Sequence, residues 1–201
     1  MPQKKKENIK SAKDSSGYVY AEKKTEWIEI IDPKRFNDTS LNRITTFFLF
    51  HTPCEGLSAM GITLENRGWK EQWKKPIWLN RQLKDKSSNP KLLFSSRILN
   101  DMKRALKEAD LLGDFPPDNY TERIGLHDNK NNQFMSVFYH LRNTFAHGRF
   151  KMVEIEDDVM FYFEDISPQK DKNGYRVSAR MVLRQSTLLN WIELIESIEK
   201  Q

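Results

Sequence analysis

The stretch NQFMSVFYHLRNTFAHG, residues 132–148, gives the strongest indication of local structure in this chain. Its large apolar residues recur at intervals of four, three and four: Phe134, Phe138, Leu141 and Phe145. An α-helix completes one turn in 3.6 residues, so this spacing places the four side chains on one face. Gly148 follows, at the position where helices commonly end in a left-handed residue. We therefore predict a helix from about Asn132 to His147 whose apolar face packs on a core.

Helical spacing also appears on both sides of this stretch. We predict a long earlier helix over Lys91–Leu112 and a last helix that begins near Ser186. Leu41–His51 is a further helix candidate, although its Thr and Phe content leaves a buried strand open. Residues 150–184 are instead rich in Val, Ile, Phe and Tyr, with a turn signal at Asn173-Gly174. The predicted fold class is mainly α, with a small antiparallel β-hairpin or three-stranded meander before the last helix.

The first 24 residues are rich in lysine. They hold seven lysines against Glu7, Asp14 and Glu22, a net charge of +4, whereas the whole chain carries +5. This composition predicts a disordered basic tail over residues 1–24, which is either merely solvated or attracts nucleic acid by counterion release. Residues 25–90 are expected to form a helical or irregular extension, and residues 91–201 the main helical domain with a β insertion at 150–184.

The composition indicates a cytoplasmic protein without a membrane span. The 201 residues contain no run of about eighteen apolar residues, and no apolar stretch of the secretory type follows the charged start MPQKKKENIK. The single cysteine, Cys54, cannot form an internal disulfide, which favours a reducing compartment. His51 and Cys54 are three residues apart, but no second pair completes a zinc set. We expect neither a metal site nor a cofactor.

Polar side chains gather at the end of the helix predicted over residues 132–147. A histidine transfers protons near neutral pH, an arginine fork fits phosphate oxygens, and an asparagine orients either group. RNA carries its own nucleophile, the 2′-hydroxyl, so proton transfer and charge stabilisation are enough to cleave it without a metal. We therefore take three residues as candidate catalytic groups: Arg142, Asn143 and His147.

The helical spacing of these residues limits how they can meet. Asn143 and His147 are four apart and share a face, whereas Arg142 and His147 are five apart, about 140° around the axis. Arg142 and His147 converge only if a second copy faces the first across a two-fold axis, or if the helix unwinds at Gly148. A purely structural role stays open, because His147 suits the negative end of a helix and Arg142 can pair with an acidic residue.

Further polar residues are weaker candidates for substrate binding. His140 lies seven residues before His147 on nearly the same stripe, where it either lines a cleft or is a satisfied, partly buried histidine. Arg180 either faces the site from a strand or pairs with Glu164 or Asp165. The His127-Asp128 pair falls in a predicted loop without the context of a serine nucleophile, so we assign it no catalytic role.

The sequence LRNTFAHG, residues 141–148, resembles the signature of the HEPN superfamily, the higher eukaryotes and prokaryotes nucleotide-binding domains. That signature is an Arg, usually followed by a polar residue, with a His after four to six intervening positions. The resemblance extends over roughly residues 120–200, which look like one bacterial branch carried on plasmids or prophages. Members paired with a nucleotidyltransferase antitoxin often have a Tyr two positions after the His, where this chain has Arg149. Regulation by adenylylation of such a Tyr is therefore not expected here, and Arg149 is a candidate for an added phosphate contact.

The resemblance implies a fold and a function. The fold would be an up-and-down helical bundle with a β-hairpin before the last helix, dimerised through the Arg-His helices. Active members are metal-independent endoribonucleases of toxin–antitoxin, abortive-infection or CRISPR-linked antiviral defence. His147 would be the general acid or base, Arg142 the phosphate binder and Asn143 the orienting group. The implied partners are RNA such as tRNA or mRNA, a second copy, and an antitoxin or defence protein. The alternatives are a non-catalytic RNA- or nucleotide-binding module and a structural dimerising partner.

Overall fold

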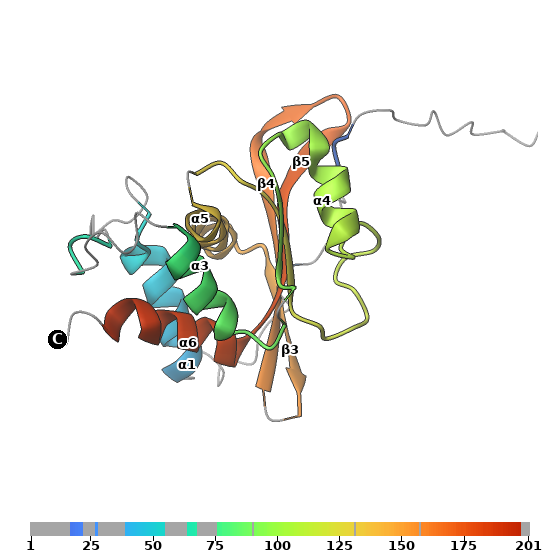
Figure 1. The fold of residues 1–201 in the computed structure, drawn as a ribbon. Coiled ribbons are helices and arrows are strands. Elements are labelled where there is room, and N and C mark those ends of the chain that lie inside the picture. Colours follow the sequence, from blue (N-terminus) through green and yellow to red (C-terminus); the bar gives the residue numbers. More distant parts are fainter. Residues whose placement is uncertain are drawn as a thin grey trace, which may run out of the picture.

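A five-stranded mixed sheet forms the centre of the molecule in the computed structural model (Figure 1). The structure describes residues 17–21, 27, 39–54, 64–67, 76–89, 91–130, 132–156 and 158–197. The strands are β1 (Leu93–Ser96), β2 (Arg123–His127), β3 (Phe150–Ile155), β4 (Asp158–Asp171) and β5 (Gly174–Arg184). Their order across the sheet is β1-β2-β5-β4-β3, with β1 parallel to β2 and all other neighbours antiparallel.

Helices cover both faces of this sheet. One face carries η3 (Leu99–Asp101), a 3₁₀ turn, and α4 (Met102–Glu108), which contacts β1, β2 and β5. The other face carries α5 (Gln133–Ala146) and α6 (Gln185–Glu196), which contact β4. Three further helical segments pack against these two helices (Figure 1): α1 (Thr39–Thr46) contacts α6, while the π-helical η2 (Phe47–His51) and α3 (Pro76–Asp85) contact α5.

Each face of the sheet has its own apolar core. The core on the α5 side is the larger and is rich in aromatic rings, with Phe134, Phe138 and Trp191 in edge-to-face contacts. The core on the α4 side contains Leu106 and Tyr162. Because both faces bury apolar side chains, the sheet lies between two layers of helix, as in other layered α/β architectures.

The predicted fold class, a mainly α up-and-down helical bundle, is wrong. The chain has an α/β fold in which the strands form the central layer rather than a small insertion before the last helix. The main error lies in residues 91–112, which were predicted to be one helix but form β1, η3 and the short helix α4. Leu92 and Met102 are fully buried, on the two faces of the sheet, so their helical spacing is fortuitous.

The second error concerns β2, which lies in a segment predicted to be a connection. Its five residues occupy the sheet between β1 and β5, where Ile124 and Leu126 are fully buried. Gly125 faces α4 so closely that a Cβ atom would lie 2.8 Å from Leu106 Cδ2. The absence of a side chain at Gly125 therefore lets α4 pack directly on β2.

The helix predicted over residues 132–147 is confirmed as α5. Asn132 caps it, since its side-chain oxygen accepts hydrogen bonds from the backbone N–H groups of Phe134 and Met135. The strands predicted after it are confirmed as β3, β4 and β5, and the last helix as α6. Leu41–His51 is also helical, although it changes from α to π geometry at Phe47.

Other predictions concern parts that the structure describes incompletely. The basic tail, residues 1–24, lies outside the described residues except for 17–21, where Val19 and Ala21 hydrogen-bond to the backbone of β5. Within the described part of the chain, none of the helices has the length and apolar character needed to cross a membrane.

Candidate functional site

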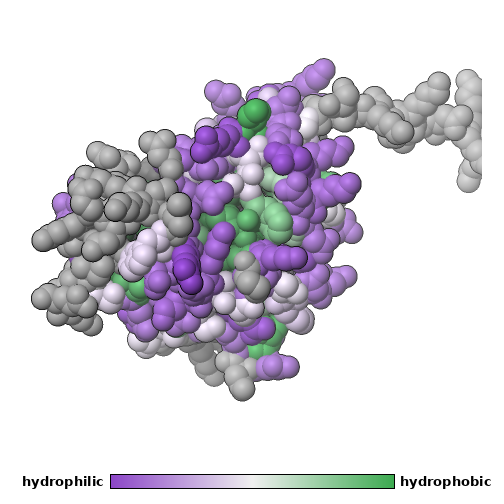
Figure 2. Space-filling view, in the orientation of Figure 1, coloured by the Kyte–Doolittle hydropathy of each residue, from purple (hydrophilic) through white to green (hydrophobic). Residues whose placement is uncertain are grey.

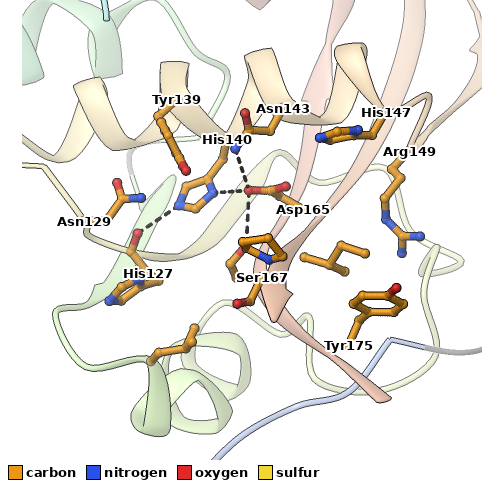
Figure 3. Close-up of a pocket in the computed structure, with 14 residues that line it drawn as sticks. His127, Asn129, Tyr139, His140, Asn143, His147, Arg149, Asp165, Ser167 and Tyr175 are labelled. Carbon is orange, nitrogen blue, oxygen red and sulfur yellow. Dashed lines mark hydrogen bonds and ion pairs between the residues drawn. The ribbon is translucent and has the colours of Figure 1, made fainter. Parts of the chain in front are cut away.

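A pocket of about 650 Å³ opens between α5 and the sheet (Figure 3). The sheet contributes the C-terminal end of β2, the second half of β4 and the first half of β5. Helix α5 lines the pocket with Tyr139, His140 and Asn143, and its C-cap residue, His147, adds a fourth side chain. With 100° per residue these four fall within one arc of about 100°, away from the apolar face of the helix. The helix thus packs on the core with one face and lines the pocket with another.

The end of α5 places two more polar groups at the pocket. The N–H of Arg149 donates to the Thr144 carbonyl oxygen at 2.8 Å, and the N–H of Gly148 to that of Phe145 at 3.3 Å. Gly148 has a φ of 62°, so the helix ends in a Schellman motif that reverses the chain. The reversal leaves His147 exposed at the rim of the pocket and brings Arg149 to its wall.

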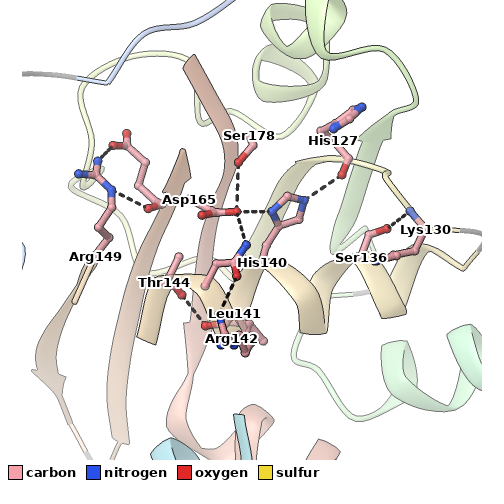
Figure 4. Close-up of polar contacts among 12 residues, drawn as sticks. His127, Lys130, Ser136, His140, Leu141, Arg142, Thr144, Arg149, Asp165 and Ser178 are labelled. Atoms are coloured by element: carbon pink, nitrogen blue, oxygen red, sulfur yellow. Dashed lines mark hydrogen bonds and ion pairs between the residues drawn. The ribbon is translucent and has the colours of Figure 1, made fainter. Parts of the chain in front are cut away.

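A buried polar network forms the floor of the pocket (Figure 4). His140 is 1% exposed, and its Nδ1 lies 2.6 Å from Asp165 Oδ2. The same carboxylate oxygen accepts from Ser178 Oγ at 3.1 Å and from Asn143 Nδ2 at 3.4 Å. The other ring nitrogen, Nε2, donates to the His127 carbonyl oxygen at 2.9 Å. Each ring nitrogen of His140 therefore faces an oxygen, and these two contacts fix the orientation of the ring.

Irregularities in the β4–β5 ladder shape this floor. Asp165 pairs with Ala179 but Ile166 pairs with Val177, so β5 has one extra residue, Ser178, at this point. Further along, Ile166 pairs with Val177 and Lys170 with Tyr175, which leaves three β4 residues opposite one β5 residue. Bulges of this kind redirect side chains, and here they lie beside the pocket. The first turns the Ser178 hydroxyl towards Asp165.

A buried charge cluster supports the wall that Arg149 forms. The Glu164 carboxylate accepts from Arg149 Nη2 with one oxygen and from Arg180 Nε, at 3.0 Å, with the other. Arg149 also donates from Nε to the Glu164 carbonyl oxygen, and its guanidinium lies over the ring of Trp27. Two arginines and one glutamate carry a net charge of +1, and Arg149 is the member that reaches the pocket.

The two histidines outside the buried network differ in surroundings. The exposed His147 ring makes no hydrogen bond to any other residue that the structure describes. His127 is half-buried, and burial lowers the pKa of its ring below the usual 6.5. The hydrogen bond that His127 Nε2 donates to the Arg97 carbonyl oxygen, 3.3 Å away, opposes that shift of the pKa. In a neutral His127 ring this bond leaves Nδ1 as the proton acceptor.

The residues predicted as the site come together only in part. Asn143, His147, His140 and Arg149 line one pocket, whereas Arg142 does not. Arg142 lies on the other side of α5, where its Nη1 donates to Asn143 Oδ1 at 3.4 Å and its buried Nε has no hydrogen-bond partner among the described residues.

Arg180 also lies outside the pocket. Of the two predicted alternatives, facing the site or pairing with Glu164 or Asp165, the structure has the second: Arg180 pairs with Glu164. Its Nη1 donates to the carbonyl oxygens of Leu111 and Gly113, both at 2.9 Å, so it acts as a buried structural group.

Three further polar contributors were not predicted from the sequence. His127 was assigned to a loop, but it ends β2 and lines the pocket. Asp165 was considered only as a partner for Arg180, and Ser178 was not singled out. Both come from strands whose bulges are set by tertiary pairing. Two features of the sequence could have pointed to these residues: His127 itself, and the adjacent acidic residues Glu164 and Asp165 within an apolar strand. Buried charged groups are normally paired, so acidic residues in such a strand indicate partners nearby.

No group of three or more His, Cys, Asp or Glu side chains is arranged to hold a metal ion in the described portion of the chain. Comparison with protein-family models, with curated proteins and with solved structures returned no match.

Proposed function

We propose that this pocket binds RNA and cleaves it by attack of the 2′-hydroxyl on the adjacent phosphate, with His147 as the proton-transfer group. The observation that carries the proposal is the position of His147, an exposed imidazole with no side-chain hydrogen bond among the described residues, at the rim of a pocket that also holds Asn143 and Arg149. The resemblance of LRNTFAHG to the HEPN signature supports the roles of His147 and Asn143, although it assigns the phosphate to Arg142 and does not extend to the fold.

The charges around the pocket favour an anionic ligand. The cluster of Arg149, Glu164 and Arg180 carries a net positive charge, and Arg149 brings it to the pocket wall. The Asp165 carboxylate is hydrogen-bonded to His140 and Ser178, so it presents little unshielded negative charge. A phosphate beside Arg149 would therefore meet a positive potential, which also stabilises the added charge of the phosphorane.

The reaction needs little covalent participation from the protein. The O2′–P bond forms and the P–O5′ bond breaks, giving a 2′,3′-cyclic phosphate and a free 5′-hydroxyl. The 2′-hydroxyl loses its proton to water, and the protonated His147 ring supplies one to the leaving 5′-oxygen. The Asn143 amide faces Asp165 Oδ2 with its nitrogen and Arg142 Nη1 with its oxygen, both at 3.4 Å, so these two weak contacts orient the amide at the pocket wall.

In this proposal Arg149 takes the phosphate-binding role that the resemblance assigns to Arg142. The groups that the proposal uses, Asn143, His147 and Arg149, all belong to one chain. The two arginines make the proposal testable: Arg149→Ala should reduce cleavage strongly, whereas Arg142→Ala should act only through Asn143 and reduce it less.

The test is cleavage of tRNA and mRNA by the purified full chain in EDTA. We expect products that end in 2′,3′-cyclic phosphate, and a loss of at least about 100-fold in His147→Ala, the size typical of a proton-transfer residue. Arg104→Ala is a matched control, since Arg104 forms an exposed ion pair with Asp101 and does not line the pocket. RNA binding without turnover in wild type would select the binding-module alternative. Cleavage that EDTA abolishes, or full activity in His147→Ala, would contradict the proposal.

A further inference from the structure

The polar residues that the proposed reaction uses form only one side of the pocket, and apolar residues form the other. Opposite the α5 stripe, the lining contains apolar side chains from three elements: Leu99 of η3, Ile166 and Pro168 of β4, and Tyr175 of β5. The space-filling view shows an apolar area on this face of the molecule, between the helical layer and the β4–β5 ribbon, bordered by hydrophilic residues (Figure 2). A phosphate alone would not use such a surface, so the proposed chemistry leaves it without a role.

Two tyrosines, Tyr139 and Tyr175, mark opposite ends of the pocket (Figure 3). Each has a lysine ammonium over its ring. Lys130 Nζ lies 5.0 Å from the ring centroid of Tyr139, and Lys170 Nζ lies 5.6 Å from that of Tyr175. Tyr175 is 42% exposed, so part of its ring is open to a ligand. An aromatic face next to a cation is the combination with which proteins hold unpaired nucleotides, the base on the ring and the phosphate near the charge.

The bulge in β4 adds polar groups between these rings. Residues 167–169 have no partner in the β4–β5 ladder, and β3 pairs with β4 only as far as Phe163. The backbone of Ser167 at the pocket is therefore outside the strand pairing on both sides. A nucleobase has hydrogen-bonding groups on its edge that such a backbone can meet.

We infer that the pocket takes an unpaired segment of RNA, with bases stacked on Tyr175 and Tyr139 and the phosphate between them near His147 and Arg149. The inference rests on the proposed function, because it names the form of RNA that the same site accepts. A volume of about 650 Å³ falls in the range of roughly 300–1,000 Å³ that suits a ligand the size of a nucleotide. A duplex would present its phosphates but keep its base faces stacked, so it would leave both tyrosine rings unused.

The test measures binding without requiring cleavage. The probe is a short single-stranded 2′-O-methyl oligoribonucleotide, which lacks the attacking hydroxyl and stays intact. It is compared with the same strand carrying abasic sites and with its duplex, each titrated into the full chain and followed by fluorescence anisotropy. We expect the single strand to bind at least about tenfold more tightly than either comparison ligand, because stacking on an aromatic ring is worth a factor of roughly 5–150 per base.

Matched variants assign the effect to the rings. Tyr175→Leu should weaken binding of the single strand by at least about fivefold and leave the abasic strand unchanged, while Tyr175→Phe should bind like wild type. Tyr139→Leu should act in the same direction, with its melting temperature recorded because Tyr139 also packs on the core. Tyr120→Leu is the control, since Tyr120 is 49% exposed and lies outside the pocket.

The outcomes separate this inference from the proposed function. Equal affinity for the intact and abasic strands, tighter binding of the duplex, no effect of Tyr175→Leu, or no binding of any probe would overturn the inference. Cleavage dependent on His147 could still be found in those cases and would leave the proposed function intact. Conversely, base-dependent binding through Tyr175 with no cleavage of ordinary RNA would support the inference and contradict the nuclease activity.

Discussion

Replacing Asp165 with alanine should destabilise the fold by about 3 kcal/mol. The Asp165 side chain is buried, and its Oδ2 accepts hydrogen bonds from His140 at 2.6 Å and Ser178 at 3.1 Å. A hydrogen bond to a charged group contributes roughly 1.5–3 kcal/mol and an ordinary one about 1 kcal/mol. The contact with Asn143, at 3.4 Å, is long enough that we assign it nothing. Removing the carboxylate also leaves buried donors without an acceptor.

This difference should be measurable by thermal unfolding followed by circular dichroism. For a chain of this length, 1 kcal/mol corresponds to roughly 2–4 °C in Tm, so we expect Asp165→Ala to lower Tm by about 6–12 °C. Asp101→Ala is the control, because Asp101 also holds a short ion pair, 2.5 Å from Arg104, but both partners are exposed to solvent. Solvent screening makes such a pair weak, so its loss should lower Tm far less.

A drop in Tm for Asp165→Ala no larger than that for Asp101→Ala would refute a stabilising role of the buried network. That result would mean that the His140–Asp165 pair contributes nothing net, as happens when desolvation of the charges offsets their attraction. His140 and Asn143 would then be held at the pocket by the packing of α5 alone.

Three further predictions concern single residues. Burial raises the pKa of the Cys54 thiol to about 12, so Cys54 should react with Ellman's reagent only after denaturation; rapid reaction of the native protein near neutral pH would contradict this. Burial lowers the pKa of His127, so its NMR titration midpoint should lie below 6.5, and His127 should contribute a loss of stability as pH falls from 6.5 towards that midpoint. A midpoint at or above 6.5 would overturn that assignment. Gly148→Ala should lower the free energy of unfolding by about 1–2 kcal/mol in urea titrations, because φ is 62° there. Gly113→Ala, where a Cβ meets nothing within 4 Å, should not, and equal effects of the two would argue against the left-handed cap.

The local structure of residues 132–197 could largely be predicted from the sequence. The spacing of Phe134, Phe138, Leu141 and Phe145 fixes the face of α5, and Gly148 its end, because these are properties of neighbouring residues. The abundance of Val, Ile, Phe and Tyr in residues 150–184 likewise indicates the strands that follow. Each of these patterns lies within a single helix or strand, and the predicted helix and strands are confirmed.

The fold class could not be predicted because it depends on β1 and β2. Neither strand exceeds five residues, and β2 reads RIGLH within a polar connection. Both are strands because they pair with each other and, in β2, with β5, more than fifty residues further along the chain. Once these two strands are recognised, the β-rich segment becomes part of a central sheet rather than an insertion in a bundle.

In the candidate site, too, residues of one helix could be predicted together, whereas residues brought in by strand pairing could not. Asn143, His147 and His140 could be predicted as one group because they share a stripe of α5. Asp165 and His127 could not, since they reach the pocket through strand pairing and a bulge. The prediction that Arg142 belongs to the site was wrong for the pocket, because Arg142 is adjacent to Asn143 in sequence but lies about 100° away around the helix.

Rescue of His147→Ala by imidazole tests most directly whether His147 transfers a proton in RNA cleavage. The rate of cleavage of a single-stranded oligoribonucleotide is measured in EDTA for wild type and for His147→Ala, with increasing concentrations of imidazole. We predict a loss of at least about 100-fold in the variant and a rate that rises with imidazole, because the free base can occupy the exposed rim from which the side chain was removed. Cleavage by His147→Ala at the wild-type rate, or no cleavage by wild type, would contradict the account.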